Sequence, residues 1–444
     1  MPNSSPSYQA LRQPLLQVRA SLAQLDLEAI ARRSGFLRRT PRKIQIPDLV
    51  AAFCALASES FLSLERMASV IGLASRCTYS KQSLHQRLAH GVQNFLGQLA
   101  LALFGQMSQP LRTQGYFAPF QRVLVQDSTM QSLPRGLAAF FPGSCDQKSK
   151  TRAALRIQWV CDLLAGSLLQ LTLCGYRRND QAAATDVLSI LKEGDLLLRD
   201  LGYFSLPVLA KLMSLGAFFL SRLRNGVILR DPDTGKEIDL LKHLRPMGRF
   251  DGPVLVGNER TLMRLVVLPV PEEVANLRRA RARTSRDQRS TPSRKRLALM
   301  DWSMFLTNVS AQVWPAEVVA KIYRLRWRIE IVFKSWKSHL RLRELNCRSA
   351  ELVRLSVMLK LLYCLLTLRC FENIKTPNPL HRQVSLLRLA RVLGYCGPLI
   401  AAVFLHITPA RLLEHYLAKG IFYEQRPDRQ NFNQKLAVLM NGLT

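Results

Sequence analysis

A segment around residue 330 carries charged and aromatic side chains at a helical spacing suited to phosphate chemistry. At 100° per residue, six polar side chains fall on one arc about 80° wide: Tyr323, Arg326, Glu330, Lys334, Lys337 and Arg341. The apolar arc beside it predicts that this helix packs on a core, with Glu330 at the margin. A carboxylate among cations stays ionised, as a metal ligand must be, and the cations could hold phosphates beside that metal.

The alternative for this segment is a surface helix with ion pairs four residues apart, such as Glu330 with Lys334. That alternative explains less well why four basic side chains and a tyrosine lie on the same helix face, hereafter the stripe, as one acid. It also leaves Trp327 and Trp336, which border the stripe, without a role.

Two further acids follow predicted strands. Asp127 ends the β-rich run 122–127, and Asp200 ends the apolar run 195–200. In open α/β sheets, functional groups gather outside the carboxyl ends of the strands. Carboxylates from two strands and one helix can converge on hard divalent ions such as Mg²⁺. Two such ions, about 3.5–4 Å apart, can activate the attacking oxygen and stabilise the leaving oxygen of a phosphodiester.

Other interpretations of these acids stay open at this point. Each strand-terminal aspartate, taken singly, is also explained as a turn cap. Asp162 and Asp186 could be assigned to the same site on similar grounds.

The elements that must position these side chains indicate a mixed α/β core of three layers. Strands are predicted at 122–127, 156–164, 167–173, 195–200 and 217–223, and helices at 180–191, 206–215 and 321–337. Residues 225–315 alternate turn residues with short strands, which predicts a β-rich insertion. The chain is expected to be helical from 315 to about 371 and again from 383 to about 440.

Two more segments could contact DNA. Helices are predicted at 49–57, at 63–71 ending at Gly72, and at 80–88. The last two, with the turn between them, form a helix-turn-helix pattern, which either binds DNA or is simple helical packing. The third of these helices carries polar side chains: Lys81, Gln82, His85, Gln86 and Arg87. A basic loop at 276–296 holds nine Arg or Lys residues and one Asp. This loop is either solvated or a phosphate contact.

Charge and composition narrow the function class. The 444 residues include 63 Lys or Arg and 31 Asp or Glu, a formal charge of +32, while 48% are hydrophobic. Such a chain is folded and favours a polyanion as partner, nucleic acid before an anionic membrane. No secretory h-region is evident, and the apolar stretch 356–368 is short and interrupted by Lys360. The nine cysteines form no Cys-x-x-Cys pair, which argues against structural zinc or a disulfide framework.

The spacing Tyr-x2-Arg-x3-Glu-x6-Lys resembles the signature of bacterial insertion-sequence transposases of the DDE class. Its four positions are Tyr323, Arg326, Glu330 and Lys337. The sequences Asp-Ser-Thr at 127–129 and Asp-Leu-Gly-Tyr-Phe at 200–204 resemble the first and second catalytic aspartates of that family. The resemblance implies an α/β, RNase H-like mixed-sheet catalytic core at 116–224 and 316–372. It also implies a β-rich insertion between the second Asp and the Glu, which agrees with 225–315. The residue patterns themselves predict a helical DNA-binding region at 1–115 and a helical C-terminal region at 373–444.

The resemblance also implies roles for individual residues. Asp127, Asp200 and Glu330 would be catalytic and would hold two Mg²⁺ ions, for which Mn²⁺ can substitute. The cations of the stripe and Tyr323 would contact DNA phosphates: Arg326, Lys334, Lys337 and Arg341. Trp302 resembles a tryptophan that helps hold an extruded base, and packing in a sheet is its alternative.

The implied function is cut-and-paste transposition by metal-dependent phosphodiester hydrolysis and strand transfer. Its partners would be transposon-end DNA and target DNA, with a homodimer in the paired-end complex and no membrane. The expected location is the bacterial cytoplasm, in association with the nucleoid. The alternative is a non-catalytic DNA-binding repressor or an inactive transposase relic, against which a complete Asp/Asp/Glu set argues.

Overall fold

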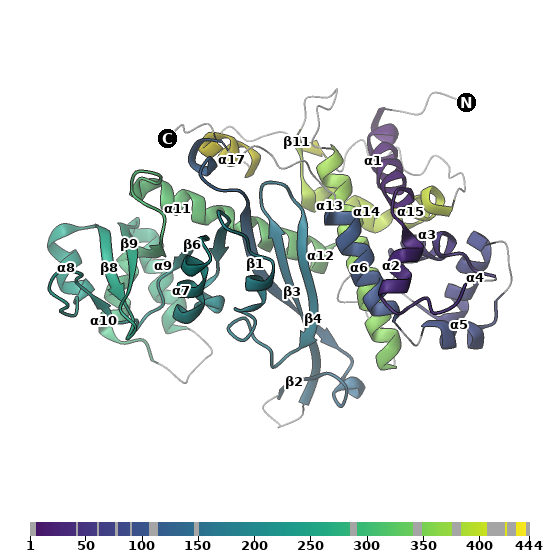
Figure 1. Cartoon of the computed structure of the whole chain (residues 1–444), viewed down its shortest axis with the longest axis horizontal. Helices are drawn as coiled ribbons and strands as arrows, with labels where there is room; N and C mark the ends of the chain where they lie inside the picture. The colour runs from purple at the N-terminus through teal and green to yellow at the C-terminus, as the bar shows by residue number, and fades with distance from the viewer. Residues whose placement is uncertain are drawn as a thin grey trace.

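The chain is described from a computed structural model, in which a central sheet separates two unlike ends (Figure 1). A β-rich segment lies at one end and the N-terminal helices lie at the other. The described residues are 6–40, 43–59, 62–75, 79–88, 91–105, 114–145, 151–284, 291–340, 349–374, 383–405, 422–423 and 432–440.

The centre of the sheet has mixed strand directions. Its strands are β1 (Val123–Leu133), β2 (Pro142–Cys145), β3 (Thr151–Asp162), β4 (Leu168–Gly175), β5 (Leu196–Arg199) and β6 (Phe218–Arg222). β3 is antiparallel to β1, β2 and β4, whereas β1, β5 and β6 run parallel to one another. This order is consistent with an RNase H-like core, so the predicted α/β fold class is confirmed. Helix α7 (Leu206–Ser214) joins β5 to β6, and a helical crossover is the connection expected between parallel neighbours.

The β-rich segment continues the same sheet. It contains β7 (Leu229–Arg230), α8 (Leu240–Met247), β8 (Phe250–Val256), β9 (Thr261–Pro269), α9 (Glu272–Arg283), α10 (Arg294–Ala298) and β10 (Trp302–Thr307). β10 pairs with β9 on one side and with β6 on the other. The strands that follow residue 225 are therefore hydrogen-bonded to the core and do not form a separate sheet.

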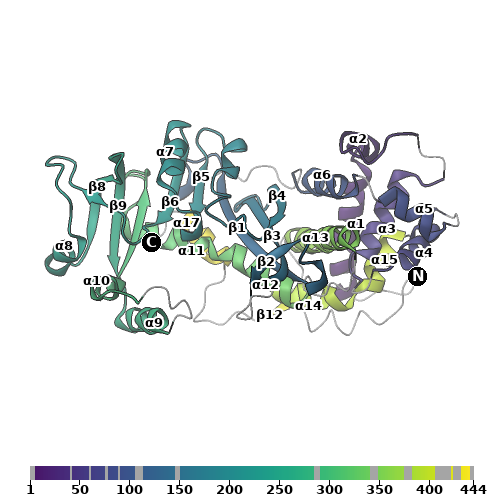
Figure 2. The ribbon, with the colours of Figure 1, turned by 90° about the horizontal axis from the view of Figure 1, so that it is seen from below.

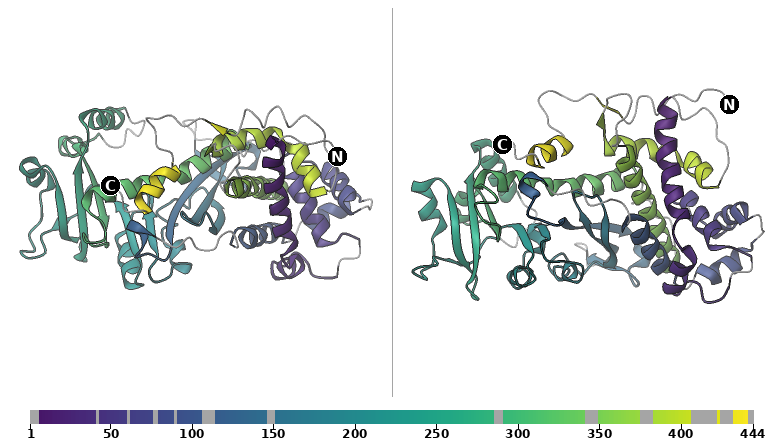
Figure 3. Two further views of the ribbon diagram at one scale, coloured as in Figure 1. Left: turned by 90° about the horizontal axis from the view of Figure 1, so that it is seen from above. Right: turned by 45° about the horizontal axis from the view of Figure 1, so that its top comes forward.

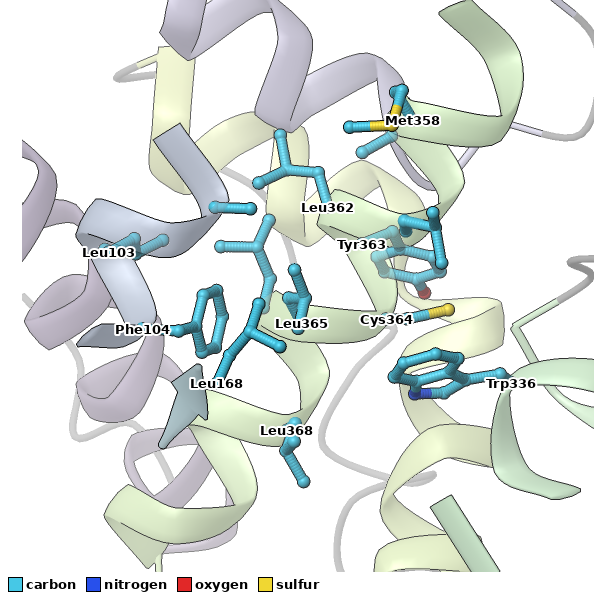
Figure 4. Packing of buried hydrophobic residues seen from close by; sticks show 14 of the residues in the cluster. Leu103, Phe104, Leu168, Trp336, Met358, Leu362, Tyr363, Cys364, Leu365 and Leu368 are labelled. Atoms are coloured by element: carbon cyan, nitrogen blue, oxygen red, sulfur yellow. The ribbon is translucent and has the colours of Figure 1, made fainter. Parts of the chain in front are cut away.

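A long apolar helix, α13 (Ala350–Ile374), packs most closely against α1 (Pro6–Ala23), α3 (Ile46–Leu56), α6 (Val92–Gly105) and α14 (Leu386–Tyr395). The helices α2 (Leu27–Arg33), α4 (Leu64–Ser75), α5 (Lys81–Leu88) and α15 (Gly397–Leu405) complete this helical part. Figure 2 shows α13 between the sheet and the N-terminal helices. Figure 4 shows its side chains between Phe104 of α6 on one side and Trp336 on the other. One buried cluster thus joins both ends of the chain to the sheet.

The C-terminal part of the chain returns to the sheet. Helix α17 (Phe432–Met440) lies against α11 (Ala316–Leu325), as Figure 3 shows. Before it, β11 (Gln383–Val384) pairs with β12 (Phe422–Tyr423). The prediction of helix from residue 383 onward is therefore wrong at its start, where Val and aromatic residues favour strand pairing. Within the described ranges, no single helix is both long enough and apolar enough to cross a membrane. Of the described helices, only α14 and α15 taken together meet these two criteria, and they are bent by 77° relative to each other.

Two further predictions about helices differ from the structure. Residues 180–191 form turns and a short 3₁₀ helix, Asp186–Ser189, in place of an α-helix. The carbonyls of Ala183 and Ala184 accept bonds from the side chains of Gln126 and Arg199, so the backbone bonds of a regular helix are replaced. Helix α4 runs through the predicted break at Gly72, since one glycine costs a helix only about 1 kcal/mol.

The predicted basic loop at 276–296 is largely helical. Its first part lies in α9 and its last part in α10, while residues 285–290 lie outside the described residues. Alanine, leucine and arginine are good helix formers, and two arginines of α9 also bind the start of β10. Arg278 donates to the carbonyl of Trp302 at 3.0 Å, and Arg279 forms an ion pair with Asp301.

Candidate active site

Strand pairing brings Asp127 and Asp200 to one edge of the sheet. In the parallel pair of β1 and β5, Gln126 lies opposite Arg199, so the two acids are the next residues along neighbouring strands. β1 itself continues past Asp127 to Leu133, because its pairing with β3 extends that far. The prediction that Asp127 ends a strand is therefore wrong. Asp127 lies within β1, at the point where the parallel pairing of β1 with β5 ends. The Asp200 carboxylate accepts a bond from the backbone N–H of Gly202 at 3.2 Å, which starts the 3₁₀ turn η4 (Leu201–Tyr203).

Helix α12 (Trp327–Ser338) brings Glu330 to the same edge. Its buried face includes Ile329, Phe333 and Trp336, and the Trp336 ring meets the Trp159 ring of β3 edge to face at 4.9 Å. Glu330 is partly exposed beside this face. Its predicted position at the margin of the core is confirmed.

The predicted single helix at 321–337 is two helices, α11 and α12, that meet at Arg326. The N–H of Arg326 donates to the Tyr323 carbonyl at 3.2 Å, and the N–H of Ile329 donates to the Arg326 carbonyl at 3.1 Å. These bonds span three residues, so one turn is tightened to 3₁₀ geometry. Arg326 keeps helical dihedral angles, φ −52° and ψ −32°, and its side chain still shares a face with Glu330.

The guanidinium of Arg326 joins the three acids. It lies 3.4 Å from the Asp127 carboxylate, 3.4 Å from the Asp200 carboxylate and 2.5 Å from the Glu330 carboxylate. The Arg326 side chain is 11% exposed, so water screens these contacts only weakly. Acids that stand 73 and 130 residues apart in the sequence are therefore neighbours in space.

The electrostatics of Asp127 reflect its burial. Burial raises the pKa of Asp127 to about 7, and the nearby Asp200 and Asp180 carboxylates act in the same direction. The backbone N–H of Ser128 and the Arg326 guanidinium oppose that rise. A cation bound beside Asp127 would favour the ionised carboxylate further.

A cavity of about 420 Å³ opens at this point. It is lined by Asp127, Ser128, Thr129, Asp200, Arg326, Glu330, Phe333, Lys334, Lys337 and Ser338. Tyr323 is close by, with Arg326 5.8 Å above its ring, and burial raises the pKa of its hydroxyl to about 12. That hydroxyl has no hydrogen-bond partner among the described residues. Acids and bases thus share one cavity, whose volume is in the range of ligand-binding pockets.

Comparison with known proteins identifies the family. The family described as "Transposase DDE domain" matches residues 118–366, more than half of the chain. The chain belongs to the DDE transposase family. It is 29% identical to the transposase of insertion sequence element IS231B from Bacillus thuringiensis subsp. berliner, with 70% of each chain covered. It is 30% identical over 70% of each chain to the IS231C transposase of the same organism. A transposase for IS1151 from Clostridium perfringens is 26% identical over 70% of this chain and 71% of its own.

Membership confirms the expected class of enzyme, since a DDE transposase domain cuts DNA and transfers strands. In this transposase the rival acids have other partners. Asp162 accepts bonds from the backbone of Leu164 and Ala165 in the β3–β4 turn, and Asp186 forms an ion pair with Arg178. Neither is among the described residues that line the cavity.

Trp302, another predicted DNA contact, is not among the described residues that line the cavity of the transposase. The Trp302 indole N–H donates to the Gly248 carbonyl at 2.7 Å, and its ring packs on the buried cluster of the insertion. Packing of Trp302 was the alternative that the sequence analysis left open. A contact between Trp302 and an extruded base stays a prediction. Arg341 lies outside the described residues.

The donor chemistry of the transposase cavity fits a hard divalent ion, because three carboxylates supply oxygen ligands. Members of this family typically use divalent metal ions. In the part of the chain that the structure describes, however, no three acids, histidines or cysteines have the spacing of a formed metal site. The guanidinium of Arg326 contacts all three carboxylates of the cavity.

Sequence reasoning missed several residues of this region. Ser128, Thr129, Phe333 and Ser338 line the cavity. Asp180 contacts Ser128 beside it, and the signal for Asp180 was present. It follows β4, which runs parallel to β1 through β3, so it emerges at the same edge of the sheet as Asp127.

Proposed function

We propose that this transposase serves an insertion sequence, as its relatives do by name, and that Asp127, Asp200 and Glu330 are its catalytic acids. The observation that carries the proposal is the convergence of these carboxylates, from β1, β5 and α12, on the single guanidinium of Arg326. The signature spacing of Tyr323, Arg326, Glu330 and Lys337 supports the assignment to the Tyr-Arg-Glu-Lys group of the family.

The three carboxylates would hold two divalent metal ions. Such ions, when bound, activate the attacking oxygen and stabilise the leaving oxygen of the phosphodiester. Lys334 and Lys337 line the same cavity and would bind the phosphates on either side of the scissile bond. The Tyr323 hydroxyl, buried without a partner among the described residues, would donate to a phosphate oxygen.

Arg326 has two tasks in this proposal. It offsets part of the negative charge of the three carboxylates, and it would turn toward a phosphate when metal ions take over that role. Arg341, which lies outside the described residues, is proposed as a further phosphate contact.

Other parts of the chain would supply DNA recognition. We propose residues 1–115 as the end-binding region, with α5 as the recognition helix because its exposed side chains are polar or basic. The core would comprise 116–224 and 316–372, the insertion 225–315 and the C-terminal region 373–444. A homodimer is proposed for the paired-end complex, since two ends must be cut together. The charge of +32 suits an enzyme that works on the nucleoid.

The experiment is Mg²⁺-dependent nicking of a supercoiled plasmid that carries the terminal repeats of the element. Glu330→Gln keeps the size of the side chain and removes the charge that binds metal. Cleavage should fall by roughly 10³-fold or more. DNA binding in a gel shift and the melting temperature should stay near those of the wild type.

Glu317→Gln is the matched control. Glu317 lies on α11 and forms an exposed ion pair with Arg249 at 3.3 Å, so its loss should leave cleavage unchanged. Wild-type cleavage by Glu330→Gln would remove the catalytic assignment. No cleavage by the wild type itself would favour the repressor or relic.

A further inference from the structure

A fourth carboxylate, Asp180, links the two strands that carry the aspartates of the active site. It lies in the connection after β4 and is about one-quarter exposed. The Ser128 hydroxyl donates to its Oδ1 at 2.5 Å, and Nη1 of Arg156 donates to the same oxygen at 2.9 Å. Nη1 of Arg156 also donates to the Ser128 hydroxyl oxygen at 2.9 Å. One side of the Asp180 carboxylate is thus tied to the residue that follows Asp127.

The other side of Asp180 meets the turn after Asp200. A Cβ atom at Gly202 would lie 3.0 Å from Oδ2 of Asp180, 3.3 Å from its Cβ and 3.5 Å from Oδ2 of Asp200. The backbone of Gly202 also donates to the Asp200 carboxylate. An alanine at this position would therefore push the Asp180 side chain back from the turn by a few tenths of an ångström.

We propose that Asp180 is a positioning residue, which sets the separation of Asp127 and Asp200 by bracing Ser128 against the turn at Gly202. Asp180 is absent from the cavity lining among the described residues, and its Oδ1 atom is occupied by Ser128 and Arg156. It therefore acts through neighbours and does not touch the reacting atoms. The proposal rests on the proposed function, in which Asp127 and Asp200 bind metal.

Two variants distinguish a positioning role of Asp180 from a role of its negative charge alone. If Asp180 acted only by its negative charge, Asp180→Glu would work, because it keeps the charge. A longer side chain cannot keep both Ser128 and Gly202 in contact, so positioning predicts failure. Gly202→Ala leaves every charge in place and disturbs the same contact from the opposite side.

The experiment compares Asp180→Glu, Asp180→Asn and Gly202→Ala with the wild type. We expect kcat for plasmid nicking to fall about 10–100-fold in all three, because misplacement of reacting groups by about 1 Å costs up to 10²-fold. Mn²⁺ binding, measured from the loss of the free-ion paramagnetic resonance signal without DNA, should weaken several-fold. The Kd for DNA and the melting temperature should stay close to those of the wild type. The kcat of the Asp180→Glu/Gly202→Ala double variant should be no lower than that of the less active single variant. The two substitutions break the same interaction, so their effects should not add.

Asp186→Asn is the matched control. Asp186 lies in the same connection and pairs with Arg178, so its loss should change neither kcat nor Mn²⁺ binding. Wild-type kcat and Mn²⁺ affinity in Asp180→Glu would overturn the proposal, as would losses that track a lower melting temperature. Failure of positioning is distinct from failure of the proposed function. If only the positioning proposal fails, Glu330→Gln loses cleavage while the Asp180 variants cut like the wild type. If the proposed function fails, the wild type itself does not cut, and the Mn²⁺ affinity of the Asp180 variants still tests the positioning proposal.

Discussion

Arg326 bridges three acids and offsets part of the charge by which they repel one another. Asp127 is 15% exposed, and Asp200 and Glu330 are each 37% exposed, so solvent screens the repulsion only in part. A guanidinium suits this task because its planar fork presents several donors in different directions.

Removal of this cation should make the fold depend on metal. In EDTA, Arg326→Met leaves the three carboxylates without their common partner, and the free energy of unfolding should fall by about 2 kcal/mol. Addition of Mg²⁺ should raise the melting temperature of Arg326→Met more than that of the wild type, because the variant offers the ion an unoccupied set of carboxylates.

The control for this prediction is Arg249→Met, which removes an exposed ion pair and should cost under about 1 kcal/mol. Thermal unfolding with and without Mg²⁺ measures both variants. Equal Mg²⁺ shifts in Arg326→Met and the wild type would contradict the metal assignment of the three acids.

At the same scale, the sequence predicted Asp127, Asp200 and Glu330 as a group, because two followed apolar strands and one sat among bases. Residue patterns alone could not rank the two aspartates above Asp162 and Asp186, and it was the resemblance of the motifs at 127–129 and 200–204 to the transposase family that singled them out. The bonds that occupy Asp162 and Asp186 are tertiary or local details. Asp180 follows a predicted strand, so its place at this edge of the sheet could be inferred, but its contacts could not. Its partners, Ser128 and Gly202, are distant in sequence, and only the sheet brings them together.

At the scale of elements, α12 holds Glu330 through aromatic packing. Trp336 is 1% exposed and meets Trp159, whereas Trp327 on the same helix is 61% exposed. Two tryptophans nine residues apart therefore have opposite environments. Helical periodicity places Trp336 on the buried face beside Phe333, and places Trp327 near Lys334.

This contrast predicts unequal costs for the same substitution. Trp336→Ala should lower the free energy of unfolding by about 3–5 kcal/mol, because it leaves a cavity and removes the edge-to-face contact. Trp327→Ala, its matched control, should change stability by less than about 0.5 kcal/mol. Urea unfolding followed by circular dichroism measures both, and similar losses in the two variants would contradict the packing of α12.

Element boundaries were predictable where local signals and tertiary contacts agree. The strands at 195–200 and 217–223 and the helix at 206–215 match β5, β6 and α7. The segment 180–191 failed because the side chains of buried Gln126 and Arg199 take its backbone carbonyls. No helix propensity within the segment reports such bonds.

At the scale of the whole molecule, the helical ends and the catalytic core share one buried cluster. Val18 of α1, Phe53 of α3 and Leu99 of α6 belong to the same cluster as Leu362 of α13. Deletion of residues 1–115 would expose this apolar surface, so the end-binding role of α5 is better tested by substitution of its polar side chains. The sequence predicted helical ends, but it carried no sign that α13 lies between them and the sheet.

The net charge of +32 gives the last prediction, which concerns α9. Arg278 and Arg279 are engaged with the start of β10, whereas Arg281 and Arg283 are exposed on the same helix. If the exposed pair binds phosphates, Arg281→Gln/Arg283→Gln should reduce the slope of log K against log[salt] by about 0.9 for each phosphate that is no longer neutralised.

The control is the double variant Lys192→Gln/Lys211→Gln, which removes two exposed lysines far along the chain from α9 and the same amount of charge. It measures the effect of the protein's long-range electrostatic field on DNA binding. Fluorescence anisotropy with a short duplex between about 50 and 200 mM salt measures both slopes. The control pair should lower affinity slightly at every salt concentration and leave the slope nearly unchanged. An equal change of slope in the two double variants would mean that α9 contributes only to the long-range field. In that case the arginines beyond Arg279 would be a solvated surface, and DNA would be held by the cavity cations and the N-terminal helices.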